Sequence, residues 1–240
     1  VVTGLAAFVA ISPIALTTHV RALDVSEDAV EPPSFFSRGA VAFARTQALS
    51  GPFFNSNNLG GYFAWTLYPS ARVFQDSRTE AYPHEHFARI LAAFQSQADW
   101  DALVAGLDWA ALSRPRPSAL SGATRFPRRD WATVYWDDAV EIVVRRTGVH
   151  ARLLERFEYL SLLPDGDVFL LLSQLAGEQG ARLRAEATRN RADNPNGFLA
   201  MGVLCLADDR GACAALDDLA RRRPSLLEPI RRIERMRVGR

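Results

Sequence analysis

The chain has 240 residues, of which 48% are hydrophobic and 23% are charged, a composition that supports a folded core and excludes wholesale disorder. All 28 basic residues are arginine, and 27 acidic residues balance them to a net charge of +1, so no overall positive field predicts nucleic-acid binding. A chain without lysine cannot use a lysine Schiff base or a Walker-type phosphate lysine, and two cysteines with four histidines exclude a cysteine-rich zinc module.

The first twenty residues, 1–20, contain no formally charged side chain. Twenty helical residues rise about 30 Å, the thickness of the hydrocarbon layer of a bilayer. A secretory signal peptide would carry a basic stretch before its apolar residues, and none is found here. We therefore expect a transmembrane helix over residues 1–21; the alternative is a core helix of a soluble α/β protein. Residues 22–34 are acidic and contain two adjacent prolines, which predicts a linker.

Residues 35–148 alternate short apolar strands with amphipathic helices. Strands are predicted at residues 51–55, 72–76 and 109–113, and a β-hairpin at residues 131–146 that turns at Asp137-Asp138. Helices are predicted at residues 35–49, with Phe36, Val41, Phe43 and Ala44 on one side, at 60–68, at 83–94, and at 100–107 with Asp99 as its cap. This order predicts an α/β domain with a small mixed, mostly parallel sheet, flanking helices and one antiparallel edge.

Residues 149–240 show no strand pattern and are expected to be all-α. Helices are predicted at residues 153–160, 168–175, 181–187, 198–206, 212–220 and 231–240. The four central ones form two pairs that lie between Pro164, Pro195 and Pro224. Tetratricopeptide-like arrays place a proline after each helix pair in a similar way, though at a longer period. We therefore predict a helical-hairpin, tetratricopeptide-like region.

A specific pattern lies between Gly51 and Arg146. An Asn precedes Gly-Gly-Tyr, a Trp and a Pro follow, a strand ends in Asp-Ser-Arg, and a Tyr comes four residues after the Arg. These positions are Asn55, Gly60, Gly61, Tyr62, Trp65, Pro69, Asp76, Arg78 and Tyr82. The pattern resembles the C-terminal extracytoplasmic region of bacterial polytopic membrane proteins of the glycosyltransferase-C type, related to protein mannosyltransferases. Ser77 stands where that family usually has Gly, so the turn there must avoid positive φ or tolerate strain.

The resemblance implies a non-catalytic extracytoplasmic part of a membrane glycosyltransferase-like protein that uses lipid-linked sugar. In such proteins the sugar-transfer Asp lies far upstream, so the parent protein would be the enzyme. The chain would lie on the periplasmic side of the bacterial inner membrane, anchored through residues 1–20, and would help to shape the donor or acceptor site. The residues expected to contact a lipid-linked sugar or a protein acceptor are Asn55, Gly60, Gly61, Tyr62, Trp65, Asp76, Arg78 and Tyr82.

Each candidate also has a plain structural interpretation. Gly60-Gly61 can bring backbone amides to a phosphate or sugar at a helix start, or it can simply form a turn. Asp76 and Arg78 can face a ligand at the end of a strand, or they can pair with each other. The cluster 84–86, His-Glu-His, favours a surface helix start over a metal site, because adjacent side chains on a helix do not face one another. No metal and no cofactor are expected.

Cys205 and Cys213 lie four residues on either side of Asp209, at a predicted helix–helix turn. This placement could bring them face to face as a disulfide in an extracytoplasmic location, or they are two small residues at tight helix contacts. The sequence contains no recognisable nucleophile triad or carboxylate pair, so no active site is predicted. The functional alternative is a membrane-tethered interaction module without enzymatic activity, whose helices over residues 164–240 bind a protein partner.

Overall fold

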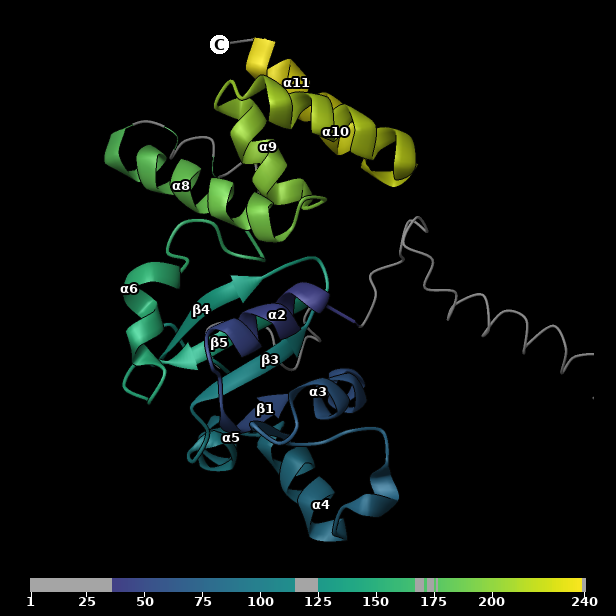
Figure 1. Cartoon of the computed structure of the whole chain (residues 1–240), viewed down its shortest axis with the longest axis vertical. Helices are drawn as coiled ribbons and strands as arrows, with labels where there is room; N and C mark the ends of the chain where they lie inside the picture. Colours follow the sequence, from purple (N-terminus) through teal and green to yellow (C-terminus); the bar gives the residue numbers. More distant parts are fainter. Residues whose placement is uncertain (1–35, 115–124, 167–170, 172–174, 176, 239–240) are drawn as a thin grey trace, which may run out of the picture. The chain divides into compact units, whose positions relative to one another are not determined.

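Five strands form one mixed sheet in the order β2-β1-β3-β5-β4 (Figure 1). The computed structural model describes residues 36–114, 125–166, 171, 175 and 177–238. The strands are β1 (Gly51–Asn55), β2 (Ala71–Val73), β3 (Trp109–Ser113), β4 (Trp131–Trp136) and β5 (Val140–Arg145). β1 pairs in parallel with β2 and β3, whereas β5 runs antiparallel between β3 and β4. The sheet is thus mixed, as expected, but its strand pairs are parallel and antiparallel in equal number rather than mostly parallel.

Helices cover both faces of this sheet, and further helices follow the last strand in the chain. They are α2 (Arg38–Thr46), α3 (Gly60–Leu67), α4 (His84–Ala93), α5 (Gln97–Val104), α6 (Leu154–Phe157), α8 (Gly177–Asp193), α9 (Phe198–Leu206), α10 (Arg210–Arg222) and α11 (Leu227–Val238). Short 3-10 turns lie at Asn57–Leu59, Thr79–Ala81, Ala151–Leu153 and Pro224–Leu226. The described residues all belong to one unit by their contacts.

The strands alternate their side chains between two buried layers. Phe53 of β1 stacks on Trp109 of β3, with ring centroids 3.8 Å apart, under α2 and α3. The neighbouring Phe54 points to the opposite face, where it meets Trp100 of α5 with centroids 5.1 Å apart, in the layer shared with α4. Because helices cover both faces of the sheet, the period-two pattern of the strands does not distinguish a solvent-exposed face from a buried one. Every residue of β4 is buried.

Three predictions of detail are corrected by the structure. The strand predicted at residues 72–76 is shorter, because pairing with β1 ends at Val73. The helix predicted to begin at Trp100 begins at Gln97, since Ser96 rather than Asp99 is its cap and accepts a hydrogen bond from the Asp99 amide at 3.0 Å. Phe36 precedes α2 and is half exposed instead of sharing the buried side of that helix.

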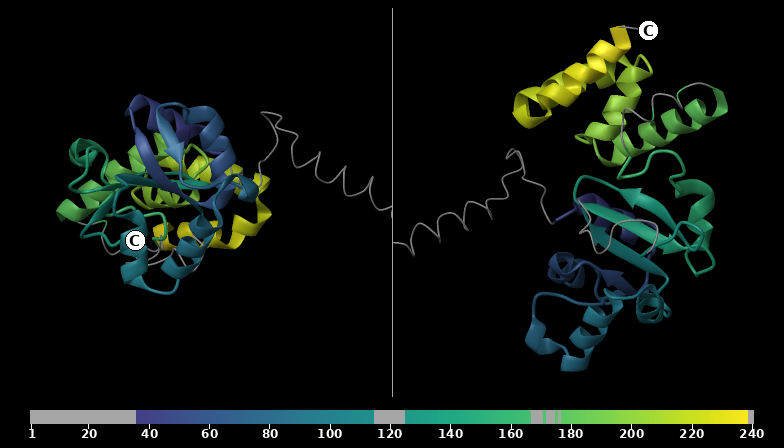
Figure 2. Two further views of the ribbon diagram at one scale, coloured as in Figure 1. Left: turned by 90° about the horizontal axis from the view of Figure 1, so that it is seen from below. Right: turned by 180° about the vertical axis from the view of Figure 1, so that it is seen from behind.

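The C-terminal region is helical, as predicted, and α9 is its centre. Helix α9 is buried along most of its length, and α8, α10 and α11 all pack against it. Figure 2 shows these helices from two further directions, beyond the β4 edge of the sheet. The predicted helix 168–175 lies largely outside the described residues. The last helix begins at Leu227, four residues before the predicted start.

Polar side chains of α8 join this region to the sheet edge. The buried Glu186 carboxylate accepts hydrogen bonds from the amides of Leu160 (3.0 Å), Ser161 (2.9 Å) and Leu162 (2.6 Å). One turn further on, Asn190 donates to the carbonyl of Trp136, the last residue of β4, at 2.9 Å. Helix α8 is therefore fixed to the α/β region by buried hydrogen bonds as well as by apolar packing.

The two aspartates of the β4–β5 turn accept hydrogen bonds from different parts of the structure. Asp137 accepts hydrogen bonds from the hydroxyl of Tyr135 at 2.8 Å and from Ser37, the residue that caps α2. Burial and the Asp137 carboxylate raise the pKa of Tyr135 above its ordinary value, so its phenol stays a donor. Asp138 instead accepts from Asn194 at 3.1 Å and from Arg223, after α10, at 3.2 Å.

The expected transmembrane helix over residues 1–21 and the linker over residues 22–34 lie outside the described residues. Among the helices that the structure does describe, none combines the length and the hydropathy that spanning a bilayer requires.

Candidate functional site

The sequence pattern converges on the carboxyl ends of two parallel strands. Asn55 is the last residue of β1, and the segment from Phe74 to Arg78 continues directly from β2. In α/β sheets, the loops that follow the carboxyl ends of parallel strands commonly hold ligands. The geometry there divides the candidate residues into buried and exposed groups.

Asn55 is completely buried, and its side-chain amide fastens the chain that follows β2. Its Nδ2 donates to the carbonyls of Gln75 (2.7 Å) and Ser56 (3.0 Å), and its Oδ1 accepts from the amides of Phe74 (2.7 Å) and Gln75 (3.4 Å). Gln75 returns the contact by donating from Nε2 to the Asn55 carbonyl at 3.2 Å. All four hydrogen-bonding positions of the Asn55 amide are occupied within the protein, so this side chain holds the segment in place.

The two adjacent glycines at the start of α3 have different surroundings. Gly60 is buried, and a Cβ atom there would lie 2.0 Å from the Gln75 carbonyl oxygen. Gly61 is exposed, and a Cβ atom there would meet nothing within 4 Å. Gly60 therefore allows two chain segments to pack closely, whereas Gly61 leaves part of the helix surface without a side chain.

Asp76 and Arg78 form a bidentate ion pair between a buried anion and an exposed cation. The Asp76 side chain is 1% exposed and the Arg78 side chain 65%. Arg78 Nε lies 3.0 Å from Asp76 Oδ2 and 3.2 Å from Oδ1, while Nη2 lies 2.5 Å from Oδ2 and the Arg78 amide 2.9 Å from Oδ1. Hydrogen bonding by this guanidinium lowers the pKa of Asp76 below its ordinary value. Within the described part of the chain no acceptor contacts Nη1, so that edge of the guanidinium faces outward.

The turn that carries this pair needs no unusual backbone. Outside glycine, the described residues with positive φ are Ala48 and Asp208, so the turn at Ser77 avoids the left-handed region. A glycine at that position is therefore not required in this chain.

Tyr82 lies beside the ion pair, on a cluster of rings. Its ring stacks on that of His86, with centroids 5.1 Å apart, and His86 in turn lies 4.8 Å from Phe74. Burial, and next the Asp76 carboxylate, raise the pKa of Tyr82. The Nε2 atom of His86 is buried and has no hydrogen-bond partner among the described residues. The described residues also contain no group of three side chains able to hold a metal ion.

Trp65 lies on the surface, although tryptophan is usually buried. It is 83% exposed, and Tyr68, which ends α3 and was not singled out from the sequence, is 75% exposed. Tyr62 is half-buried and meets Phe36 edge to face, with ring centroids 5.1 Å apart. The structure thus brings Asn55, Gly60, Asp76, Arg78 and Tyr82 together around residues 74–78, and places Gly61 and Trp65 on an outward face of α3.

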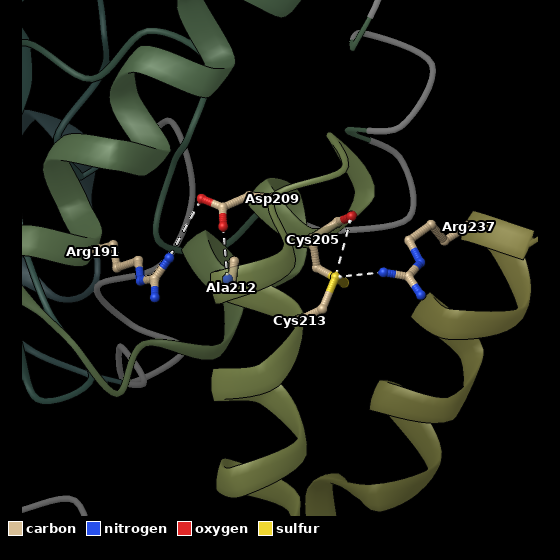
Figure 3. The surroundings of a disulfide bond; sticks show 6 residues. All are labelled: Arg191, Cys205, Asp209, Ala212, Cys213 and Arg237. Carbon is tan, nitrogen blue, oxygen red and sulfur yellow. Dashed lines mark hydrogen bonds and ion pairs between the residues drawn. A yellow bond between two sulfur atoms is a disulfide. The ribbon is translucent and has the colours of Figure 1, made fainter.

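A disulfide joins Cys205, at the end of α9, to Cys213 in α10 (Figure 3). Cys205 is buried and Cys213 half-buried, and Arg237 Nη1 lies 3.0 Å from the Cys213 sulfur. Asp209, between the cysteines, caps α10 by accepting from the Ala212 amide at 2.9 Å.

Comparison of the chain with protein-family models, with curated proteins and with solved structures finds no match.

Proposed function

We propose that this chain is a non-catalytic, extracytoplasmic part of a membrane glycosyltransferase-like protein, where it helps to shape the site for a lipid-linked sugar donor or its acceptor. The proposal starts from the pattern between Asn55 and Tyr82 and its resemblance to such proteins. In this proposal the chemistry belongs to another part of the parent protein, and the chain described here supplies binding and orientation.

The observation that carries the proposal is the Asp76–Arg78 pair. A guanidinium held at Nε and Nη2 by a buried carboxylate keeps a fixed orientation, so its Nη1 edge can bind an anion with little loss of side-chain entropy. Lipid-linked sugars carry phosphate at the sugar–lipid junction, which is a ligand that such a guanidinium recognises. The half-buried Tyr82 adds a phenol, kept protonated by its raised pKa, next to the same place.

The disulfide supports the extracytoplasmic location. Disulfides persist in oxidising compartments and are rare in the cytosol, and this one joins both cysteines of the chain. The uncharged stretch 1–20 supports attachment to a membrane, since it is long enough for one helical span.

The test compares Arg78→Gln with Arg72→Gln in the full-length protein in its native membranes. Arg72 is an exposed arginine of β2 and serves as the matched control. We expect Arg78→Gln to lower sugar transfer from a polyprenyl-phosphate donor roughly 10-fold, the effect of losing a charge-assisted hydrogen bond of about 1.5 kcal/mol. Arg72→Gln should transfer at the normal rate.

Equal transfer rates in the two variants would contradict the proposal. Expression and the Cys205–Cys213 disulfide should be checked in both variants, so that a loss of folding is not mistaken for a loss of binding. Binding of a short polyprenyl phosphate, compared with inorganic phosphate, separates recognition of the lipid-linked anion from recognition of any phosphate.

A further inference from the structure

The longest uncharged part of the described structure is also its most exposed aromatic part. Residues 46–71 contain no Asp, Glu, Arg or His, although 23% of the whole chain is charged. Much of this stretch is buried, as strand β1 and the inner side of α3 require. Its outer side is not: Trp65 is 83% exposed and Tyr68 is 75% exposed. A surface of this kind usually contacts something other than water.

These side chains follow one another at helical spacing. On a helix, residues three apart lie on the same side, which places Tyr62 and Trp65 on one side of α3, and Tyr68 follows directly after the helix. Phe36 extends the row, because its ring lies 5.1 Å from that of Tyr62. We call these four residues, Phe36, Tyr62, Trp65 and Tyr68, the aromatic surface. Gly61, one turn before Trp65, adds no side chain that would cover it.

We infer that the aromatic surface docks on the headgroup region of the membrane in which residues 1–20 are anchored. The inference rests on the membrane attachment in the proposed function. Trp and Tyr are the side chains enriched at the boundary between lipid and water, because their rings are apolar and their N–H and O–H groups still reach water. The basic residue Arg45 donates a hydrogen bond to the carbonyl of Thr66, between Trp65 and Tyr68, where it can meet lipid phosphates.

The position of the surface in the chain favours a membrane over a soluble partner. The described structure begins at Phe36, which is itself part of the aromatic surface, so the chain enters the domain beside it. Residues 21–35 can span at most about 50 Å, whatever their conformation. An anchor at residues 1–20 would therefore hold the start of the domain within about 50 Å of the bilayer, and such a tether raises the local concentration of the aromatic surface at the membrane.

The tryptophans of the chain provide a selective probe. Trp65 is 83% exposed, whereas the other four tryptophans are at most 3% exposed: Trp100, Trp109, Trp131 and Trp136. The difference in fluorescence between the wild-type protein and Trp65→Phe is thus the emission of Trp65, which is the only exposed tryptophan among the five. The full chain is reconstituted into vesicles of phosphatidylcholine and phosphatidylglycerol whose acyl chains carry bromine near the headgroups, and into vesicles without bromine.

We expect brominated lipid to quench most of the Trp65 emission and acrylamide to quench it less than in the absence of vesicles. The matched control is Leu91→Trp combined with Trp65→Phe. Leu91 is 66% exposed on α4, which covers the opposite face of the sheet from α3, so a tryptophan there should stay in water and escape the brominated lipid.

The outcomes separate this inference from the function on which it rests. A chain that resists carbonate extraction from the vesicles, while Trp65 is quenched no more than the tryptophan of the control, overturns the docking and leaves the membrane attachment standing. The occupant of the aromatic surface would then be a soluble ligand such as a sugar ring. A chain that does not float with the vesicles at all overturns the attachment and the docking together.

Discussion

Gly60 and Asp76 are in direct contact, so close that a Cβ atom at position 60 would lie 2.6 Å from both Cα and Cβ of Asp76. Contacts below 3 Å cannot be kept without movement of one of the two segments. Because Gly60 has an ordinary helical φ of −58°, a glycine is required there by close packing and not by backbone conformation. The start of α3 and the segment that orients Arg78 are therefore one packed unit.

Gly60→Ala and Gly61→Ala should change stability in opposite directions. Gly60→Ala forces α3 away from residues 75–76 and should lower the free energy of unfolding by about 1–3 kcal/mol. Gly61→Ala meets open space and replaces glycine within a helix, so it should raise that free energy by about 0.5–1 kcal/mol. Urea unfolding of the full chain in detergent micelles measures both. Two equal effects would show that the close contact at Gly60 is absent.

Arg78→Gln should make the protein more sensitive to acid. In the folded protein the pKa of Asp76 lies below its ordinary value, chiefly because of Arg78, so the ionised carboxylate stabilises the fold at pH values above about 4. That contribution is lost as the pH falls through the lowered pKa. Without the Arg78 side chain, the largest cause of the lowered pKa of Asp76 is gone while burial still raises that pKa, so acid unfolding should begin at a higher pH. Stability measured from about pH 2 to 7 tests this, and Arg72→Gln should keep the original acid profile.

Glu186→Gln should weaken the connection between α8 and the α/β region. A glutamine offers one acceptor oxygen where the carboxylate offers two, so the amides of residues 160–162 cannot all remain paired. We expect a loss of about 2 kcal/mol in the free energy of unfolding. Glu178→Gln, an exposed position in the first turn of the same helix, should change it by less than about 0.5 kcal/mol. Equal effects of the two substitutions would contradict a special role for Glu186.

Reduction of the disulfide should destabilise the helical region. Closing a loop between Cys205 and Cys213 is worth about 2–3 kcal/mol by the chain-entropy relation. The melting temperature of the full chain should therefore fall by roughly 5–10 °C in dithiothreitol. The double variant Cys205→Ala, Cys213→Ala should melt at the lower temperature with or without the reductant. A wild-type melting temperature that does not respond to dithiothreitol, with free thiols shown to have formed, would refute this expectation.

Local patterns predicted most of the elements. The strand at residues 109–113 and the helix at 198–206 have the predicted bounds, because each is a short apolar run between residues that stop it. The start of α5 was placed three residues late, since Ser96 and Asp99 both suit a helix cap and only the fold selects between them. The early end of β2 has a long-range cause: the side chain of Asn55 takes the backbone groups that a further strand pair would use.

The division of the candidate residues into buried and exposed groups could not be predicted from the sequence. The end of β1 at Asn55 could be predicted, whereas β2 ends at Val73 and not at Asp76, and residue type does not reveal which polar side chains are fully paired. The exposure of Trp65 could not be predicted either, because a tryptophan in a short apolar helix is most often part of the core. The roles of Glu186 and Asn190 in α8 gave no local signal, since their partners at residues 160–162 and at Trp136 lie far away in the chain.

The turn between β4 and β5 also determines how mechanical force would travel through the molecule. A pull on the chain ahead of Phe36 reaches α2 first, and the hydrogen bond that Ser37 donates to Asp137 passes part of it to this turn. The next residue, Asp138, is bonded to Asn194 and Arg223, so the same two-residue turn transmits tension to the C-terminal helices. Because Asp137 also accepts hydrogen bonds from Tyr135 of β4 and from the amide of Val140, the first residue of β5, the same turn passes tension into the two strands that it joins.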